Sequence, residues 1–210
     1  MKFQDVYFVN GTAYAGKSTL VKKLAEKYGG IACEENYHNA LLDELDRAQF
    51  PGLTYTRDLQ DWRHFIRRTP DEYERWIDRT SKECEMLELQ ILEGLTGQGK
   101  KIFVDTNISL ETLQKITDRD HVLIMLAEPD ISVYRFFERP DREKQFLYQL
   151  LLKEENPEAA MENFRNCLKR INSPERYRRF LHAGFHVILR NEGRSIEETC
   201  ELAEKLLKLK

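Results

Sequence analysis

The chain has 210 residues, of which 41% are hydrophobic and 33% are charged, so it can bury one large core or form one domain that carries an insertion. The formal net charge of -3 at pH 7 gives no general attraction to nucleic acid or to an anionic membrane surface. No apolar run reaches the roughly 18 residues of a membrane-spanning helix. The 4 cysteines are scattered without a CxxC pair, which disfavours a zinc site or disulfide framework and favours a reducing cytoplasm.

The first part of the chain alternates short apolar runs with amphipathic segments. Residues 3–9 form an apolar run that ends at Asn10-Gly11, which predicts a buried strand rather than a signal peptide. Residues 18–27 carry apolar side chains at helical spacing, and residues 31–33 predict a second, very short strand. Residues 37–97 are almost wholly helical in pattern. Within them, Thr69 and Pro70 predict the start of a long helix that the glycines at 97 and 99 end.

Three more apolar runs follow, at residues 101–104, 121–127 and 185–189, and a capping box of Ser195 and Glu198 opens a last helix. Short continuous apolar strands between amphipathic helices predict an α/β fold, a three-layer doubly wound sheet of five parallel strands in a single domain 1–210. Ligands of such sheets bind at the carboxyl ends of the strands. These ends predict one rim formed by Gly11, Glu34, Glu35, Asp105, Glu128 and Asn191.

The segment after the first strand matches G-x4-G-K-[ST] at Gly11, Gly16, Lys17 and Ser18. In such a loop, backbone N–H groups and the positive end of the following helix face phosphates, and the glycines allow a close approach. The lysine can reach the β- and γ-phosphates, and the serine hydroxyl can ligate magnesium. The motif therefore predicts a site for ATP and Mg²⁺ formed by Gly11, Thr12, Ala13, Tyr14, Ala15, Gly16, Lys17, Ser18 and Thr19.

Acidic residues at the ends of two strands are candidates for metal binding and proton transfer. We expect Asp105 to hold Mg²⁺ together with Ser18. The alternative for Asp105 is a turn or a helix cap, although Ser109 can cap the helix that follows. Glu34 or its neighbour Glu35 can act as base for an acceptor hydroxyl, or each can be a solvated turn carboxylate.

Arginines recur in the segment of about 130–150, where Arg135, Arg139 and Arg142 have spacings of four and three. On a helix these spacings share one face, and guanidinium groups stabilise the charge of a transferring phosphoryl group. The pattern predicts a lid that closes over ATP. The alternative is a surface helix in which the arginines pair with acidic neighbours.

A second arginine-rich stretch lies within 37–97, in "RDLQDWRHFIRR". Arginines interleaved with aromatic residues can line a basic acceptor pocket, or they can form a solvated face over a core seam. The residues concerned are Arg57, Trp62, Arg63, Phe65, Arg67 and Arg68.

With the loop, the post-strand aspartate and the arginine segment in this order, the chain resembles the small P-loop kinases. These include nucleoside and nucleoside monophosphate kinases, shikimate and gluconate kinases, and AAA-domain-labelled P-loop NTPases. Only the loop is a specific motif: Asp105 is followed by "TNIS", not by the Gly-Phe-Pro-Arg of adenylate kinases, and the Asp-Arg-Ser of deoxynucleoside kinases is missing. The Asn-Lys-x-Asp motif of GTPases is also missing.

The resemblance implies that magnesium-ATP sits on the loop and that the helical insertion 37–97 binds the acceptor. It also implies that adenine rests between a lid arginine, Arg135 or Arg139, and the backbone around Asn191 and Gly193. Tyr14 is expected to touch the acceptor, because it stands where variable loop residues face the substrate.

Together these observations predict an ATP-dependent kinase that transfers the γ-phosphate to a small-molecule acceptor, such as a nucleoside, a nucleotide or another hydroxyl compound. It is expected to be cytoplasmic, a monomer or homodimer, with no membrane partner and no nucleic-acid partner. The alternative function is a nucleotide-dependent regulatory ATPase or switch that phosphorylates no acceptor.

Overall fold

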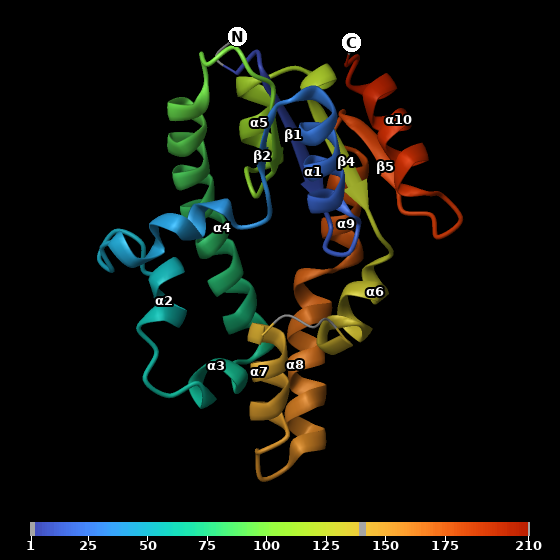
Figure 1. Cartoon of the computed structure of the whole chain (residues 1–210). Helices are drawn as coiled ribbons and strands as arrows, with labels where there is room; N and C mark the ends of the chain where they lie inside the picture. The colour runs from blue at the N-terminus through green and yellow to red at the C-terminus, as the bar shows by residue number, and fades with distance from the viewer. Residues whose placement is uncertain (1–2, 139–141, 210) are drawn as a thin grey trace.

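A computed structural model of the chain describes residues 3–138 and 142–209, and strands and helices alternate along them (Figure 1). The strands are β1 (Val6–Gly11), β2 (Ile31–Cys33), β3 (Ile102–Asp105), β4 (Val122–Leu126) and β5 (His186–Leu189). The first five α-helices are α1 (Lys17–Tyr28), α2 (Leu53–Arg57), α3 (Arg63–Ile66), α4 (Pro70–Leu95) and α5 (Leu110–Ile116). The others are α6 (Pro129–Tyr134), α7 (Arg142–Leu151), α8 (Pro157–Ile171), α9 (Pro174–Leu181) and α10 (Ile196–Leu206). Short 3-10 helices form η1 (Tyr37–Glu44), η2 (Arg119–His121) and η3 (Phe136–Glu138).

The strands form one five-stranded sheet in the order β2-β3-β1-β4-β5, and every described pairing is parallel. The strand β1 is central, with Val9 opposite Asp105 of β3 and Gly11 opposite Met125 of β4. The chain turns from β1 towards β2 and β3, and later crosses to β4 and β5 on the other side. Such a switch point is where open α/β sheets bind ligands, and the motif loop begins there.

Alternate side chains of the strands feed two separate hydrophobic cores. One contains Tyr7 and Val9 of β1 with the apolar stripes of α1 and α10. The other contains Val6 and Phe8 of β1 with side chains of α5, α9 and the second half of α4. Helices therefore cover both faces, and the predicted α/β fold with five parallel strands in three layers is confirmed.

A third hydrophobic core lies beyond the carboxyl ends of the strands, in the lower half of Figure 1. It joins Phe65 of α3, Tyr73 of α4, Val133 of α6, Leu147 of α7 and Phe164 of α8. The insertion 37–97 and the segment 130–150 therefore pack against each other through α8, an element whose ends the sequence analysis did not identify. They are parts of one helical layer over the rim.

The long helix of the insertion begins as the sequence predicts. The Thr69 side chain accepts from the Glu72 backbone N–H, the Glu72 side chain accepts in return from Thr69, and Pro70 occupies the first turn. All four cysteines are free and buried. None of the described helices combines the length with the apolar composition needed to cross a bilayer.

Candidate functional site

The loop between β1 and α1 has the backbone shape of an anion cradle. Gly16 stands at the N-cap of α1 with a φ of 91°, and Tyr14 also has a positive φ, of 63°. Among the described residues, no side chain caps the first turn of α1. The N–H groups of that turn are thus left for an external acceptor, and the helix dipole favours an anionic one.

The near end of the loop is fixed to β4. Gly11 has a φ of 132°, and a Cβ atom added to it would lie 1.9 Å from the carbonyl oxygen of Met125. Thr12 donates its backbone N–H to the same carbonyl at 3.0 Å. The Thr12 hydroxyl also accepts the N–H of Ala127 at 2.7 Å. Only glycine permits this approach of the two strands.

Lys17, Ser18 and Asp105 meet where β1 and β3 end. The Ser18 hydroxyl donates to Oδ2 of Asp105 at 2.6 Å, and Nζ of Lys17 lies 3.6 Å from Oδ1. Lys17 also donates to the carbonyl of Thr12 at 3.2 Å, so its amine is held over the loop. Burial raises the pKa of the Asp105 carboxyl, although Lys17 and Ser18 both act to lower it.

These groups suit a magnesium ion. Mg²⁺ is usually bound by one or two protein oxygens, with phosphate oxygens and waters completing its octahedron. Ser18 and the Asp105 carboxylate, which is only 3% exposed, supply adjacent oxygens beside the phosphate cradle. The helix-capping alternative for Asp105 is wrong, because Ser109 caps α5 by accepting the N–H of Thr112.

The two carboxylates after β2 differ in their surroundings. The Glu34 carboxylate is 3.4 Å from Nζ of Lys22 on α1 and is half exposed. Glu35 lies near enough to Asp105 to contribute to the raised pKa of that carboxyl. Of this pair, Glu35 is therefore the better placed to face a substrate on the rim, whereas the sequence analysis put Glu34 among the candidate catalytic residues.

A cavity of about 330 Å³ lies between the loop and the turn after β5. Asn191 lines it as the resemblance implies, whereas Gly193 donates its N–H to Oδ1 of Asn191 at 2.9 Å. Its lining combines apolar side chains with polar and charged ones, which suits a nucleotide base. Its lining residues include Ala15, Gly16, Thr19, Met125, Ile188, Arg190, Glu192 and Arg194.

Tyr14 and the carbonyls beside it are held by two other segments. The Tyr14 hydroxyl donates to the backbone carbonyl of Arg135 at 2.6 Å, and Arg190 donates to the carbonyl of Tyr14. Ser132 donates to the carbonyl of Ala13 at 3.4 Å. The side chain of Tyr14 thus extends towards α6, and the expectation that it faces the acceptor has no support from these contacts.

The expected single arginine face of the lid is wrong in its geometry. The helix α6 ends at Tyr134 and α7 begins at Arg142, so Arg135 and Arg142 belong to different elements. Pro140 lies between them in the sequence, and a proline cannot donate the hydrogen bond of a helix interior. Arg135 is half exposed and lies 3.8 Å from Glu138. Arg139 lies outside the described residues, so its predicted role stays a prediction.

Sequence analysis missed the acidic side chains that hold the loop after Asp105. Glu88 of α4 is fully buried and accepts from the Thr106 hydroxyl at 2.6 Å. It also accepts from the backbone N–H of Asn107 at 3.0 Å and from its side chain at 2.9 Å. A glutamate within the apolar stripe of a helix was the available signal, because such a charge is rarely buried without partners.

His38 extends this buried network. Its Nδ1 lies 3.3 Å from Oε1 of Glu88, and its Nε2 lies 3.3 Å from the sulfur of Cys84. The thiol is only 5% exposed, and burial raises its pKa to about 12. A thiol of that kind is a poor nucleophile at neutral pH, so the cluster is a structural one that ties η1 and α4 to the end of β3.

The comparisons with known proteins give no family. No model of a protein family matches the sequence, and no curated protein matches it at a significant level. Functional inference therefore depends on the geometry of the site.

Proposed function

We propose that the chain is an ATP-dependent kinase with the fold of the P-loop NTPases, similar to the small nucleotide kinases, and that it transfers the γ-phosphate to a small molecule. The observation that carries the proposal is the meeting of Lys17, Ser18 and Asp105 beside the uncapped first turn of α1. That arrangement supplies a cation for the phosphates, two oxygens for Mg²⁺ and a row of N–H donors.

Each residue has a role in this proposal. The backbone N–H groups of residues 13–18 hold the phosphates, and Lys17 balances charge on the β- and γ-phosphates. Mg²⁺, when bound by Ser18 and Asp105, supplies further neutralisation of phosphate charge. An oxygen of the acceptor bonds to the γ-phosphorus as the bond to the β–γ bridging oxygen breaks, and ADP leaves. Where that oxygen is a hydroxyl, Glu35 is the carboxylate we assign to receive its proton.

The helical layer over the rim favours a kinase over the alternative, a regulatory ATPase. Residues of the insertion and of the described parts of the segment 130–150 share a hydrophobic core, so they form one helical layer on the side of the sheet where the γ-phosphate would lie. The 330 Å³ cavity beside the turn after β5 supports a purine base as the other half of the nucleotide. The free cysteines are consistent with the proposed cytoplasmic location.

The test is ATP turnover with and without a panel of nucleosides, nucleotides, polyols and sugar acids. We expect at least one compound to raise turnover above basal hydrolysis and to appear as a phosphorylated product by mass spectrometry. Lys17→Ala should abolish turnover, because its amine is the cation held over the loop. Lys23→Ala is the matched control, since Lys23 lies on the same helix and pairs at the surface with Glu26.

Two results would contradict the proposal. Near-normal turnover in the Lys17→Ala protein would remove the phosphate loop from the mechanism. Basal hydrolysis that no acceptor stimulates, in a protein that binds ATP, would favour the regulatory ATPase.

A further inference from the structure

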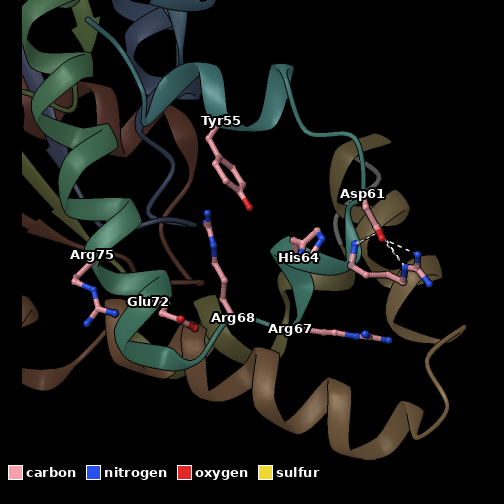
Figure 2. A pocket seen from close by; sticks show the side chains of 8 residues that line it. Tyr55, Asp61, His64, Arg67, Arg68, Glu72 and Arg75 are labelled. Atoms are coloured by element: carbon pink, nitrogen blue, oxygen red, sulfur yellow. Dashed lines mark hydrogen bonds and ion pairs between the residues drawn. The ribbon is translucent and has the colours of Figure 1, made fainter. Parts of the chain in front are cut away.

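A second cavity, of about 760 Å³, opens within the insertion among α2, α3 and the start of α4 (Figure 2). It is open to solvent and strongly polar. Four arginines line it together with two carboxylates, a tyrosine and a histidine: Tyr55, Asp61, Arg63, His64, Arg67, Arg68, Glu72 and Arg75. We call this cavity the arginine pocket.

Most charges of the arginine pocket are already engaged. Asp61 accepts from the Arg63 guanidinium at 2.6 Å and 2.9 Å. Glu72 caps α4, accepting from Thr69 at 2.8 Å and 2.9 Å. Arg67 donates to Glu154 at 2.7 Å, outside the pocket lining. Arg63 and Arg67 are therefore paired. Glu72, whose pKa the hydrogen bonds from Thr69 lower most, is also close enough to Arg75 and Arg68 for their charges to lower it further.

Arg68 points inward and forms no ion pair within 4.0 Å with a described residue, although the charge of Glu72 lies near it. Its guanidinium carbon lies 4.1 Å from the ring centroid of Tyr55 and 5.2 Å from that of Trp76, so cation–π contacts hold it in place. Figure 2 shows Arg68 and Tyr55 pointing towards each other across the cavity, whereas Arg67 points outward.

One nitrogen of the same guanidinium, Nη1 of Arg68, is buried and has no hydrogen-bond partner within the part of the chain that the structure describes. Leaving a buried donor without a partner costs free energy. A bound ligand that supplies the missing acceptor would remove this cost. The backbone carbonyl of Arg68 is fixed by Asn163 at 2.8 Å, so the side chain starts from a rigid point. Nη1 of Arg68 is thus a donor left for the oxyanion of a ligand.

The arginine pocket also lies on the correct side of the sheet for catalysis. In Figure 1, α2, α3 and the start of α4 lie beyond the carboxyl ends of the strands, on the side of the motif loop. Arg68 directly precedes the cap of α4, and the same helix carries Glu88, which holds the loop after Asp105. Helix α4 thus runs from the residue that follows the cap beside Arg68 to the side chain that holds the two residues after Asp105.

We infer that the acceptor is an anion, and that the arginine pocket binds its oxyanion group, a phosphate monoester or a carboxylate, through the Arg68 guanidinium beside the Tyr55 ring. This inference rests on the proposed kinase function, because it names the class of acceptor. Planar, bidentate recognition of an oxyanion is what an arginine fork provides and a lysine does not.

The experiment compares matched acceptors that differ only in the anionic group. Nucleoside 5′-monophosphates are paired with their nucleosides, and sugar acids with the neutral sugars. We expect the anionic member of a pair to stimulate ATP turnover and the neutral member not to do so. The pair that responds distinguishes a phosphate from a carboxylate.

Arg68→Gln should raise the KM for the anionic acceptor about 10- to 100-fold, the usual effect of losing a charge-assisted hydrogen bond. The matched control is Arg165→Gln on α8. The side chain of Arg165 is 42% exposed, and its guanidinium lies 4.0 Å from Glu162, the outer limit of an ion pair. Arg68→Lys keeps the charge near Tyr55 but lacks the fork; it should fold and still raise the acceptor KM.

A binding measurement separates failure of this inference from failure of the kinase proposal. The Lys17→Ala protein is titrated by calorimetry with the same monophosphates and sugar acids, with and without Arg68→Gln. Arg68-dependent binding without any stimulated turnover in the wild-type protein would refute the kinase and keep the anion site. An acceptor KM that is unchanged in both Arg68 variants, or a preference for neutral acceptors, would overturn the inference.

Discussion

Replacing Glu88 with alanine tests how the insertion is joined to the end of β3. Glu88 accepts three hydrogen bonds from Thr106 and Asn107, the two residues that follow Asp105. It also lies 3.3 Å from His38. The change therefore removes the shared acceptor of a buried network without touching the phosphate loop.

The magnitude follows from which donors are buried. The Thr106 hydroxyl is buried, and a buried donor left without a partner costs about 1–3 kcal/mol. Asn107 is exposed, so its two donors can bind water instead. Part of the loss is offset because alanine no longer buries an anion. The net loss expected is about 1–3 kcal/mol, a measurable fraction of the roughly 5–15 kcal/mol that stabilises a typical domain.

The assay is urea unfolding followed by tryptophan fluorescence and circular dichroism. The matched control is Gln90→Ala, an exposed residue of the same helix, which should change stability by less than about 0.5 kcal/mol. In protein that remains folded at low temperature, turnover should require more Mg²⁺, since Thr106 and Asn107 position the strand end that carries Asp105.

Two outcomes would refute this reasoning. A loss below about 1 kcal/mol would mean that the buried carboxylate costs nearly as much as its hydrogen bonds contribute. A large loss with an unchanged magnesium requirement would mean that the network supports the fold but does not position Asp105.

Three further predictions concern the loop and the buried acids. Burial raises the pKa of Asp105 in the folded protein. Above the ordinary carboxyl pKa, the folded protein therefore binds more protons than the unfolded one. The free energy of unfolding without Mg²⁺ should fall as the pH rises from about 4. In urea titrations, Asp105→Asn should remove the pH-dependent loss of stability that Asp105 causes, and it should raise the magnesium requirement of turnover. A pH profile of stability that is the same in the variant would contradict this prediction. Gly11→Ala, with its Cβ 1.9 Å from the Met125 carbonyl, should cost about 3 kcal/mol or more in denaturant unfolding; Gly94→Ala, whose Cβ meets nothing within 4 Å, should stabilise α4 by about 0.4–1 kcal/mol. Burial raises the pKa of Cys84 to about 12, so this thiol should react with a disulfide reagent only after unfolding, and rapid labelling of the native protein would show that η1 opens.

Local signals were enough to predict the sheet. Strand-length apolar runs identified β1 to β5, and the caps at Thr69 and Ser195 identified where α4 and α10 begin. The G-x4-G-K-[ST] spacing placed Lys17 and Ser18 at a strand-to-helix turn, and Asp105 was placed on the same rim because parallel strands end together. These features depend on periodicity and short-range chemistry, which a single sequence records.

Long-range partners could not be predicted in the same way. Nothing near Glu88 indicates that its donors come from residues 106 and 107, or that Glu34 turns towards Lys22. The lid was misjudged because the arginine spacing was interpreted on one continuous helix, although α6 ends at Tyr134 and the 3-10 helix η3 follows it. In "RDLQDWRHFIRR", Arg68 lines a pocket and Phe65 packs into the core. That the pocket binds an acceptor stays a prediction.

The length of α4 gives the molecule a mechanical property. The helix has 26 residues, and the part from Thr69 to Glu88 is a lever of roughly 28 Å at 1.5 Å per residue. Its far half is clamped by the acceptors at Glu85 and Glu88, so a tilt of about 4° about that clamp moves the start of the helix by about 2 Å. In the proposed function, an anion bound at Arg68 would therefore act on the start of a helix whose far half holds the two residues that follow Asp105.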